Sequence, residues 1–162
     1  MEITIERVVE ATPELRALVG ELNELLEAAY PPEQRHGLAL ERLFDPHMRF
    51  FLARLEGAPV GCGGVALFDN FAEVKRMYTR PEARGRGVAK ALLHRIEQEA
   101  RAAGLPLLYI ETGTLQREAI GLYQRNGFRR CAAFGPYAAM PAENIATSLF
   151  FAKALRAAAA RQ

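Results

Sequence analysis

The sequence contains few residues of the kinds that build metal sites or disulfide frameworks. Its 162 residues include two cysteines and three histidines, and no Cys-x-x-Cys pair occurs. Cys62 and Cys131 lie far apart, each among apolar residues, which argues against a zinc site and favours a reducing compartment. We therefore predict that the protein binds no metal and that both cysteines pack as small core residues.

The sequence also lacks a surplus of one charge and a long apolar run. Its 21 basic and 19 acidic residues leave a formal net charge of +2, which is too small to indicate a nucleic-acid partner. Residues 1–18 carry acidic side chains where a secretion signal needs basic and then apolar ones. No segment approaches the ~20 consecutive apolar residues of a membrane span. We expect a soluble, cytoplasmic protein that acts without nucleic acid or membrane.

The residues that are present indicate a globular protein. Half of them are hydrophobic and a quarter are charged, and no low-complexity tract or internal repeat interrupts the chain. A chain of this length can bury a substantial core within one domain. We predict a single domain over residues 1–162, in which the alanine-rich stretch 155–162 forms a disordered tail.

Hydrophobic periodicity divides the chain into strands and helices. Helical spacing occurs in residues 13–30, 38–44, 88–103 and 117–127, and strand-like patterns occur in residues 2–8, 48–57, 59–70, 71–79, 105–112, 128–134 and 147–155. The three consecutive strands predict an antiparallel meander, and the strand, helix and strand of residues 71–112 predict a right-handed crossover to a parallel neighbour. The expected fold is α/β (α+β), with a mixed, mostly antiparallel sheet of about six to seven strands and about four flanking helices.

The turn before the helix at residues 88–103 combines two glycines with two arginines, in the order Arg84, Gly85, Arg86, Gly87. Free backbone N–H groups at a helix N-terminus attract anions, and glycine lets a ligand approach closely. A tight turn with solvated arginines is the alternative interpretation. Lys90 stands where a G-x-G-x-x-G motif needs its third glycine, and no G-x-x-x-x-G-K-[ST] string occurs. The stretch therefore predicts an anion site, but not that of a dinucleotide-binding fold or a P-loop.

Two stretches in order resemble the signatures of the GCN5-related N-acetyltransferase (GNAT) superfamily. Residues 84–89, with Val88 and Ala89 completing the turn, match [QR]-x-x-G-x-[GA] after a strand that ends in "MYTRPEA". Residues 118–128, "EAIGLYQRNGF", match A-x-x-L-Y-x-x-x-G-F. The similarity covers residues 48–153 well, and it extends to the N-terminal third only through the order of its strand and helix.

The resemblance implies that acetyl-coenzyme A binds where two parallel strands, residues 72–79 and 106–112, splay apart. The expected contacts are the backbone of Met77, Tyr78 and Thr79 for the pantetheine arm, and Arg84, Gly85, Arg86, Gly87, Val88 and Ala89 for the pyrophosphate. Many relatives carry an asparagine that helps to hold this cosubstrate three residues before the alanine of the second signature. This chain has Gln116 there, which keeps the amide but adds a methylene.

The resemblance also implies two catalytic residues. Tyr123 matches the tyrosine of the family that supplies a proton to the departing thiolate, although packing in the core is the alternative role. Glu73, at the start of the central strand, is the first candidate for the base that takes the proton of the amine. It could instead be solvated or pair with Lys75 or Arg76, and Glu111 is the rival base or a residue that binds the amine.

The acceptor pocket is expected from the segments "YPPEQRHG" and "FGPYAAMPAEN". Its candidate contacts are Tyr30, Arg35, His36, Glu111 and Tyr137. An arginine at this position favours an acceptor with a carboxylate, such as an amino acid, although Arg35 and His36 could equally be ordinary loop residues.

Three functions agree with these features. The first is direct transfer of an acetyl group from acetyl-coenzyme A to the primary amine of a small molecule, in a ternary complex. The second is acetylation of protein N-termini or lysines, and the third is a catalytically silent module that senses acetyl-coenzyme A. Short flanks favour the first function, and Tyr123 and Glu73 favour an enzyme over a silent module. Sheets of this family often pair through a terminal strand, so we also predict a homodimer.

Overall fold

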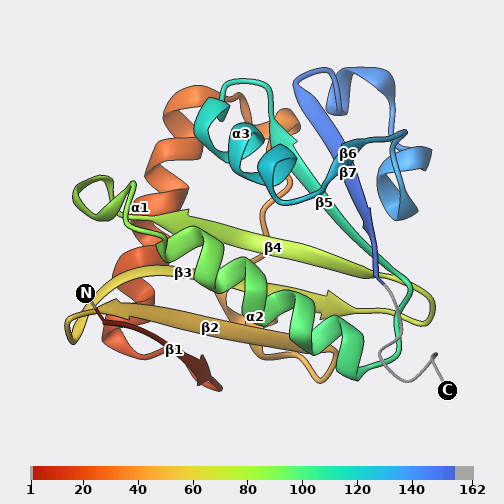
Figure 1. The fold of residues 1–162 in the computed structure, drawn as a ribbon. Coiled ribbons are helices and arrows are strands. Elements are labelled where there is room, and N and C mark those ends of the chain that lie inside the picture. Colours follow the sequence, from red (N-terminus) through yellow and green to blue (C-terminus); the bar gives the residue numbers. More distant parts are fainter. Residues whose placement is uncertain (1, 156–162) are drawn as a thin grey trace, which may run out of the picture.

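The computed structural model describes residues 2–155, which share one seven-stranded sheet (Figure 1). The strand order is β1-β2-β3-β4-β5-β7-β6, and β4 with β5 is the parallel pair. The strands are β1 (Ile3–Val8), β2 (Met48–Leu55), β3 (Ala58–Leu67), β4 (Ala72–Thr79), β5 (Leu107–Gly113), β6 (Arg129–Arg130) and β7 (Ser148–Ala154). The mixed, mostly antiparallel sheet is confirmed.

Three α-helices occur in the described part of the chain: α1 (Pro13–Ala29), α2 (Val88–Ala102) and α3 (Arg117–Arg125). The helix expected at residues 38–44 is the 3-10 helix η2 (Leu40–Phe44); the other 3-10 helices are η1 (Pro32–Gln34), η3 (Pro81–Ala83), η4 (Gly135–Ala139) and η5 (Ala142–Asn144). Among residues 2–155, no helix is long and apolar enough to cross a membrane.

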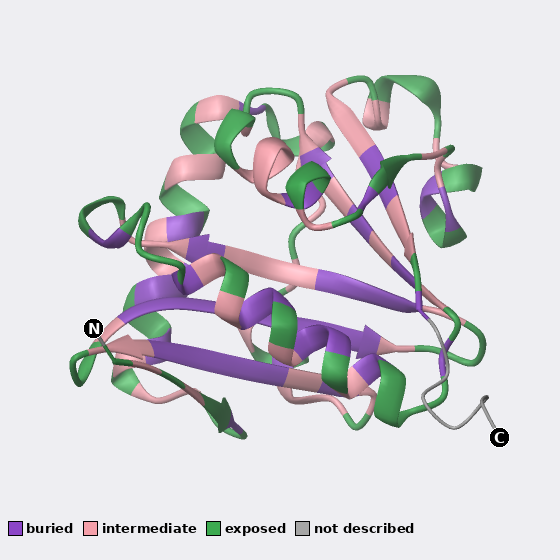
Figure 2. Cartoon of the chain, in the orientation of Figure 1, coloured by how far each residue is buried: buried purple, intermediate pink, exposed green. Residues whose placement is uncertain are grey.

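The two longer helices cover opposite faces of the sheet (Figure 1). Thr12 caps α1 by accepting a hydrogen bond from the Leu15 N–H, and Pro13, the first helical residue, has no N–H that would need an acceptor. The buried stripe of α1 includes Leu15, Leu18 and Leu22, and α2 buries its own stripe against the other face. Strands β2 and β3 lie between these layers and are buried along most of their length (Figure 2).

Two segments near the C-terminal end of the described chain differ from the sequence-based expectation. The strand expected over residues 128–134 is reduced to β6, because the chain turns so that Phe134 can pack on Tyr137 and Phe150. Leu155, the first residue of the predicted tail, is 7% exposed, and its N–H donates to the Pro106 carbonyl. Residues 156–162 of that predicted tail lie outside the described residues.

The parallel pair is joined only at one end. β4 pairs with β5 at two positions, Ala72 with Leu108 and Glu73 with Tyr109. Beyond Glu73 the two strands diverge, as Figure 1 shows, while β5 pairs with β7 along its whole length. The predicted splay between these strands is therefore present.

A β-bulge in β4 changes which side chains face α1. Lys75 pairs with Gly64 and Tyr78 pairs with Cys62, so β4 carries one residue more than β3 between these positions. In a regular strand Lys75 and Tyr78 would point to opposite faces, because side chains alternate. The bulge brings Tyr78 and Arg76 to the α1 side, where they contact Glu21 and Asn23, and the backbone of Arg76 has a positive φ of 57°. A left-handed conformation costs a non-glycine residue about 1–2 kcal/mol, so the surrounding structure must enforce it.

Candidate functional site

The N-terminus of α2 lacks a side-chain cap. Gly87 is the N-cap residue, with φ 86°, and Gly85 also has a positive φ, 77°. Glycine suits both positions, because other residues rarely adopt this conformation. The first N–H groups of α2 have no acceptor within the helix, so they remain available to an anion.

Arg84 connects this turn to its neighbours. Its Nε donates to the Thr79 carbonyl at 3.2 Å, and its Nη1 lies 3.6 Å from Oε1 of Glu118 in the first turn of α3. Arg84 therefore contacts both the end of β4 and the start of α3, although its ion pair with the exposed Glu118 adds little stability.

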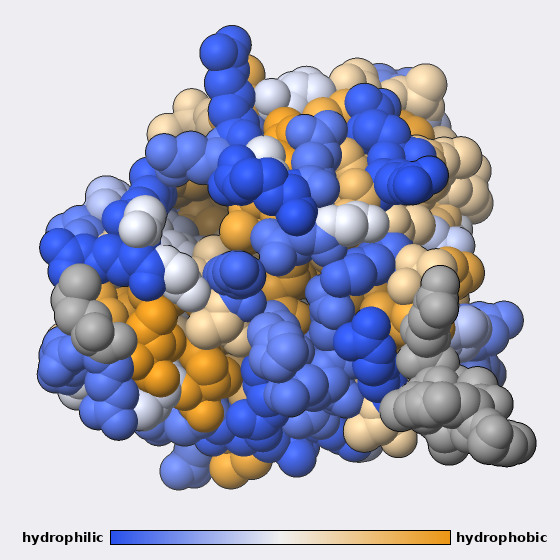
Figure 3. All heavy atoms as spheres, viewed as in Figure 1, coloured by the Kyte–Doolittle hydropathy of each residue, from blue (hydrophilic) through white to orange (hydrophobic). Residues whose placement is uncertain are grey.

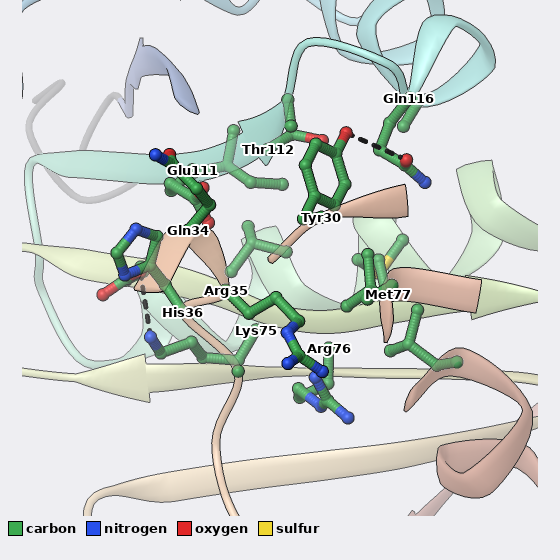
Figure 4. A pocket seen from close by; sticks show the side chains of 18 of the residues that line it. Tyr30, Gln34, Arg35, His36, Lys75, Arg76, Met77, Glu111, Thr112 and Gln116 are labelled. Atoms are coloured by element: carbon green, nitrogen blue, oxygen red, sulfur yellow. Dashed lines mark hydrogen bonds and ion pairs between the residues drawn. The ribbon is translucent and has the colours of Figure 1, made fainter. Parts of the chain in front are cut away.

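A pocket opens where β4 and β5 diverge. Its walls come from α1, residues 34–37, β4, β5, α3 and Tyr137. Figure 3 shows a hollow in the molecular surface between α3 and the start of α2, and Figure 4 shows side chains that line the pocket. Met77 and Tyr123 line it from the core on the α2 face, and Leu22 lines it from the core on the α1 face. Residues from both faces of the sheet therefore line the pocket.

The residues of β4 that were predicted to contact the cosubstrate have different positions. Met77 lines the pocket. The side chain of Tyr78 turns toward α1, where its hydroxyl donates to Glu21 at 3.0 Å. Burial is the main cause that raises the pKa of Tyr78 to about 12, and this hydrogen bond adds to it. Tyr78, Thr79 and the turn of residues 84–89 are not among the residues that line the pocket.

Tyr30 and Gln116 meet at one end of the pocket (Figure 4). The Tyr30 hydroxyl accepts from the Leu115 N–H at 3.0 Å and donates to Oε1 of Gln116 at 3.2 Å. Gly113 makes room for this contact, because a Cβ there would overlap the Tyr30 hydroxyl. Tyr30 therefore holds the turn between β5 and α3 while its ring lines the pocket.

Glu73 lies at the other end, in a buried network. It is 3% exposed, and its Oε2 accepts from the Tyr137 hydroxyl at 2.7 Å and from Lys75 Nζ at 3.1 Å. Lys75 was the alternative partner weighed for Glu73, and it is the partner found. Burial, followed by the charge of Glu73, raises the pKa of Tyr137, so this phenol remains a donor at neutral pH.

Glu111 and His36 approach the same network. Ser148 Oγ donates to Oε2 of Glu111 at 2.7 Å. Burial raises the pKa of Glu111, and this hydrogen bond opposes the rise, as do the charges of His36 and Lys75. His36 Nε2 lies 2.7 Å from the Asn144 carbonyl, so this nitrogen carries a proton and donates, and the ring packs edge-on against Tyr137. Four residues predicted from distant segments therefore converge: Glu73, Glu111, His36 and Tyr137.

Tyr123 projects from α3 and lines the pocket. It is 3% exposed, and its ring packs near Phe128 and Phe151, with centroids 5.8 and 6.5 Å away. Burial is the main cause that raises its pKa, and the charge of Glu111 adds to it. Its hydroxyl has no hydrogen bond to any described residue. Core packing and an available hydroxyl, the two roles weighed for Tyr123, are thus compatible.

Arg76 lines the pocket, but the sequence analysis did not identify it as a pocket residue. There Arg76 was considered only as a possible ion-pair partner of Glu73. It lines the pocket beside Arg35, and its Nη2 donates to Asn23 of α1. Its position depends on the bulge in β4, for which the stretch "EVKRMYT" carries no local signal.

Three features of the fold and the site are those of an acyltransferase. The parallel strands β4 and β5 splay apart, a pocket lies between them, and the helix that follows β4 begins without a side-chain cap. The family model described as "Acetyltransferase (GNAT) family" matches residues 18–128, which is more than half of the sequence. The chain therefore belongs to the GNAT family of acetyltransferases, and the resemblance noted in its sequence is confirmed.

Three similar proteins illustrate this membership. The chain is 43% identical over 155 residues to an IAA acetyltransferase of Azospirillum brasilense, covering 94% of this chain and 98% of that protein. The crystal structure of a protein of Klebsiella pneumoniae, assigned as an acyl-CoA N-acyltransferase, superposes with a TM-score of 0.79, 33% identity, and coverage of 95% and 98%. The PaiA N-acetyltransferase of Thermoplasma acidophilum, in complex with coenzyme A, shares the fold, with a TM-score of 0.74, 19% identity, and coverage of 96% and 100%.

Proposed function

We propose that this enzyme transfers the acetyl group of acetyl-coenzyme A directly to the primary amine of a small molecule, in a ternary complex in the cytoplasm. The observation that carries the proposal is the pocket between β4 and β5, which is lined by Tyr123 and by a cluster of titratable side chains. The uncapped turn before α2 does not line this pocket but follows the end of β4, where Arg84 contacts the Thr79 carbonyl. A donor and an acceptor can thus meet in the gap from opposite faces of the sheet.

The donor would occupy the side of the pocket that carries α2 and α3. Residues 84–89 supply N–H groups and arginine charge for a pyrophosphate, and the two glycines keep the backbone accessible. The edge of β4 beyond Glu73 has no strand beside it from β5, so the backbone of Met77, Tyr78 and Thr79 is available to an amide-bearing chain. Gln116 holds Tyr30 and can offer the rest of its amide to the same ligand.

The chemistry joins the amine nitrogen to the acetyl carbon and breaks the carbon–sulfur bond. The amine must first lose a proton, because a lysine-like amine with a pKa of ~10.4 is mostly charged at neutral pH. A backbone N–H near Met77 or Tyr78 would stabilise the charge that develops on the acetyl oxygen. The thiolate leaves with a proton from Tyr123, whose hydroxyl is protonated at neutral pH and has no described partner.

Two carboxylates compete for the role of base. Glu73, the first candidate from the sequence, already accepts from Lys75 and Tyr137, so two donors occupy its Oε2. Glu111 has one donor, Ser148, and a pKa raised by burial, which brings it closer to the pH at which a base works best. We therefore assign proton removal to Glu111, directly or through water, and assign to Glu73 the positioning of Lys75 and Tyr137.

The test is release of the coenzyme A thiol from acetyl-coenzyme A across a panel of amino acids, simple amines and lysine-containing peptides. We expect the fastest release with a small-molecule amine, above the rate without acceptor. Faster turnover of peptides would instead identify a protein acetyltransferase. Binding of acetyl-coenzyme A without release for any acceptor would favour the sensor module.

A further inference from the structure

Two arginine side chains meet on the α1 side of the pocket. Arg35 comes from the loop after η1, and Arg76 comes from the bulge in β4; Figure 4 shows their guanidinium groups beside each other. Both arginines also line an adjoining hollow beneath α1, together with Asn23 and Glu27. The two cations therefore lie where an acceptor that enters from this face would pass.

The hydrogen-bonding capacity of these guanidinium groups is largely unused. In residues 2–155, the Nε atoms of Arg35 and Arg76 are the two buried side-chain nitrogen or oxygen atoms without a hydrogen-bond partner. Arg76 donates through Nη2 to Asn23, a neutral side chain. A buried donor without an acceptor destabilises the fold, so this arrangement needs a reason.

The positive charge of the pair is also poorly balanced. Arg35 Nη1 lies 3.7 Å from Oε2 of Glu27, whose side chain is 61% exposed, and such an exposed pair contributes little. Burial lowers the pKa of Arg76, which reflects the cost of a cation removed from water. Nearby, Gly37 leaves the space that the Arg76 guanidinium fills, because a Cβ there would overlap Nη1. The chain thus keeps room for a buried cation whose anionic partner it does not itself supply.

We propose that Arg35 and Arg76 bind an oxyanion of the acceptor, so that the substrate is an amine that also carries an acidic group. This inference rests on the proposed function and names the substrate class for that site. A guanidinium offers parallel N–H donors that match the two oxygens of a carboxylate or a phosphonate. The N–H groups of the two guanidinium groups that face the pocket would supply the donors for this anion.

The far end of the same pocket has the opposite charge. Glu73 and Glu111 lie there, on the same face of the sheet as Arg76. Lys75 pairs with Glu73, so Glu111 is the carboxyl group that is left to bind the ammonium group of the acceptor. A pocket with arginines at one end and carboxylates at the other orients a molecule that carries both charges. An amino acid or an aminoalkylphosphonate has this form, whereas a neutral monoamine or a polyamine does not.

The test compares acidic amines with neutral analogues of the same shape. We would measure kcat/KM for amino acids, for their carboxamides and for aminoalkylphosphonates, with the wild type and with Arg76→Gln and Arg35→Gln. We expect the wild type to prefer the acid over its carboxamide by at least tenfold, and each substitution to remove most of that preference through a higher KM for the acid. Arg42→Gln, in η2 and away from the pocket, is the matched control and should keep the wild-type preference.

The dissociation constant for acetyl-coenzyme A separates this inference from the proposed function. This constant should not change in either arginine variant, since Arg35 and Arg76, which form the proposed clamp for the oxyanion, lie on the acceptor side of the pocket. Calorimetric titration of the preferred amino acid and its carboxamide, with coenzyme A bound, tests the clamp even if no acceptor is turned over. Equal affinity for acid and carboxamide in the wild type, or equal loss of both in the folded variants, would overturn the clamp. Better activity with phosphonates than with carboxylates would support it and identify the oxyanion.

Discussion

Tyr123 combines a buried ring with a hydroxyl that has no hydrogen-bond partner among the described residues. The hydroxyl can therefore be removed without disturbing the packing of the ring. Tyr123→Phe keeps the ring against Phe128 and Phe151, so the fold should persist. If the hydroxyl protonates the leaving thiolate, kcat should fall by about 10²-fold or more, with little change in the affinity for acetyl-coenzyme A. Stopped-flow or steady-state thiol release measures this. A kcat equal to that of the wild type would show that another group, or water, supplies the proton.

Ser148 offers a way to move the pKa of Glu111 without removing the carboxylate. The Ser148 hydrogen bond stabilises the carboxylate anion, so its loss in Ser148→Ala should raise the pKa of Glu111 further. A base must be ionised to act; the acidic limb of the kcat/KM profile should therefore shift to higher pH. Ser148→Thr, which keeps a hydroxyl, should retain the wild-type profile. An unmoved limb in Ser148→Ala, together with a shifted limb in Tyr137→Phe, would transfer the role of base to Glu73.

At the scale of elements, the start of α2 depends on backbone conformation more than on space. A Cβ at Gly87 would approach only Ile3 Cδ1, at 3.8 Å, but the φ of 86° is unfavourable for any L side chain and worst for a β-branched one. Gly87→Val should therefore distort the turn and weaken binding of acetyl-coenzyme A by at least tenfold, while the protein still folds. Calorimetric titration with coenzyme A measures the loss.

Gly20 provides the matched control for that substitution. It lies within α1, has an ordinary φ, and a methyl group on its Cα would have nothing within 4 Å. Gly20→Ala should leave coenzyme A binding unchanged and stabilise the fold by about 0.5–1 kcal/mol. Unaltered affinity in Gly87→Val would contradict the assignment of the pyrophosphate to this turn.

Elements set by local patterns could be predicted from the sequence, and features set by neighbouring strands could not. The cap of α1 at Thr12 and the glycine turn before α2 are local, so their positions were predicted closely. The bulge at Arg76 depends on its pairing with β3, and β6 is short because Phe134 joins an aromatic cluster formed by distant segments. Among the residues that line the pocket, His36 and Tyr137 had been named from the sequence as candidate contacts, whereas Arg76 had not.

At the scale of the whole molecule, the two ends of the sheet differ. β6 is two residues long, whereas β1 has six residues, with backbone groups on its outer side that no described strand pairs. An unpaired edge of this length can accept another strand. We expect a homodimer, with a sedimentation mass twice that of the chain at micromolar concentration. A single-chain mass that persists at millimolar concentration would contradict this.

The two residue pairs that join β4 to β5 also have a mechanical consequence. They divide the sheet into two parts, β1–β4 and β5–β7, with a seam between β4 and β5. Apart from these two residue pairs, the helices and the shared core hold the two parts together. Thermal motion should concentrate along such a seam, because few backbone hydrogen bonds cross it. A ligand that lies in the seam would supply the missing crosslinks. Binding of the ligand should then rigidify the whole sheet. Amide hydrogen exchange should become slower even in strands that the ligand does not contact.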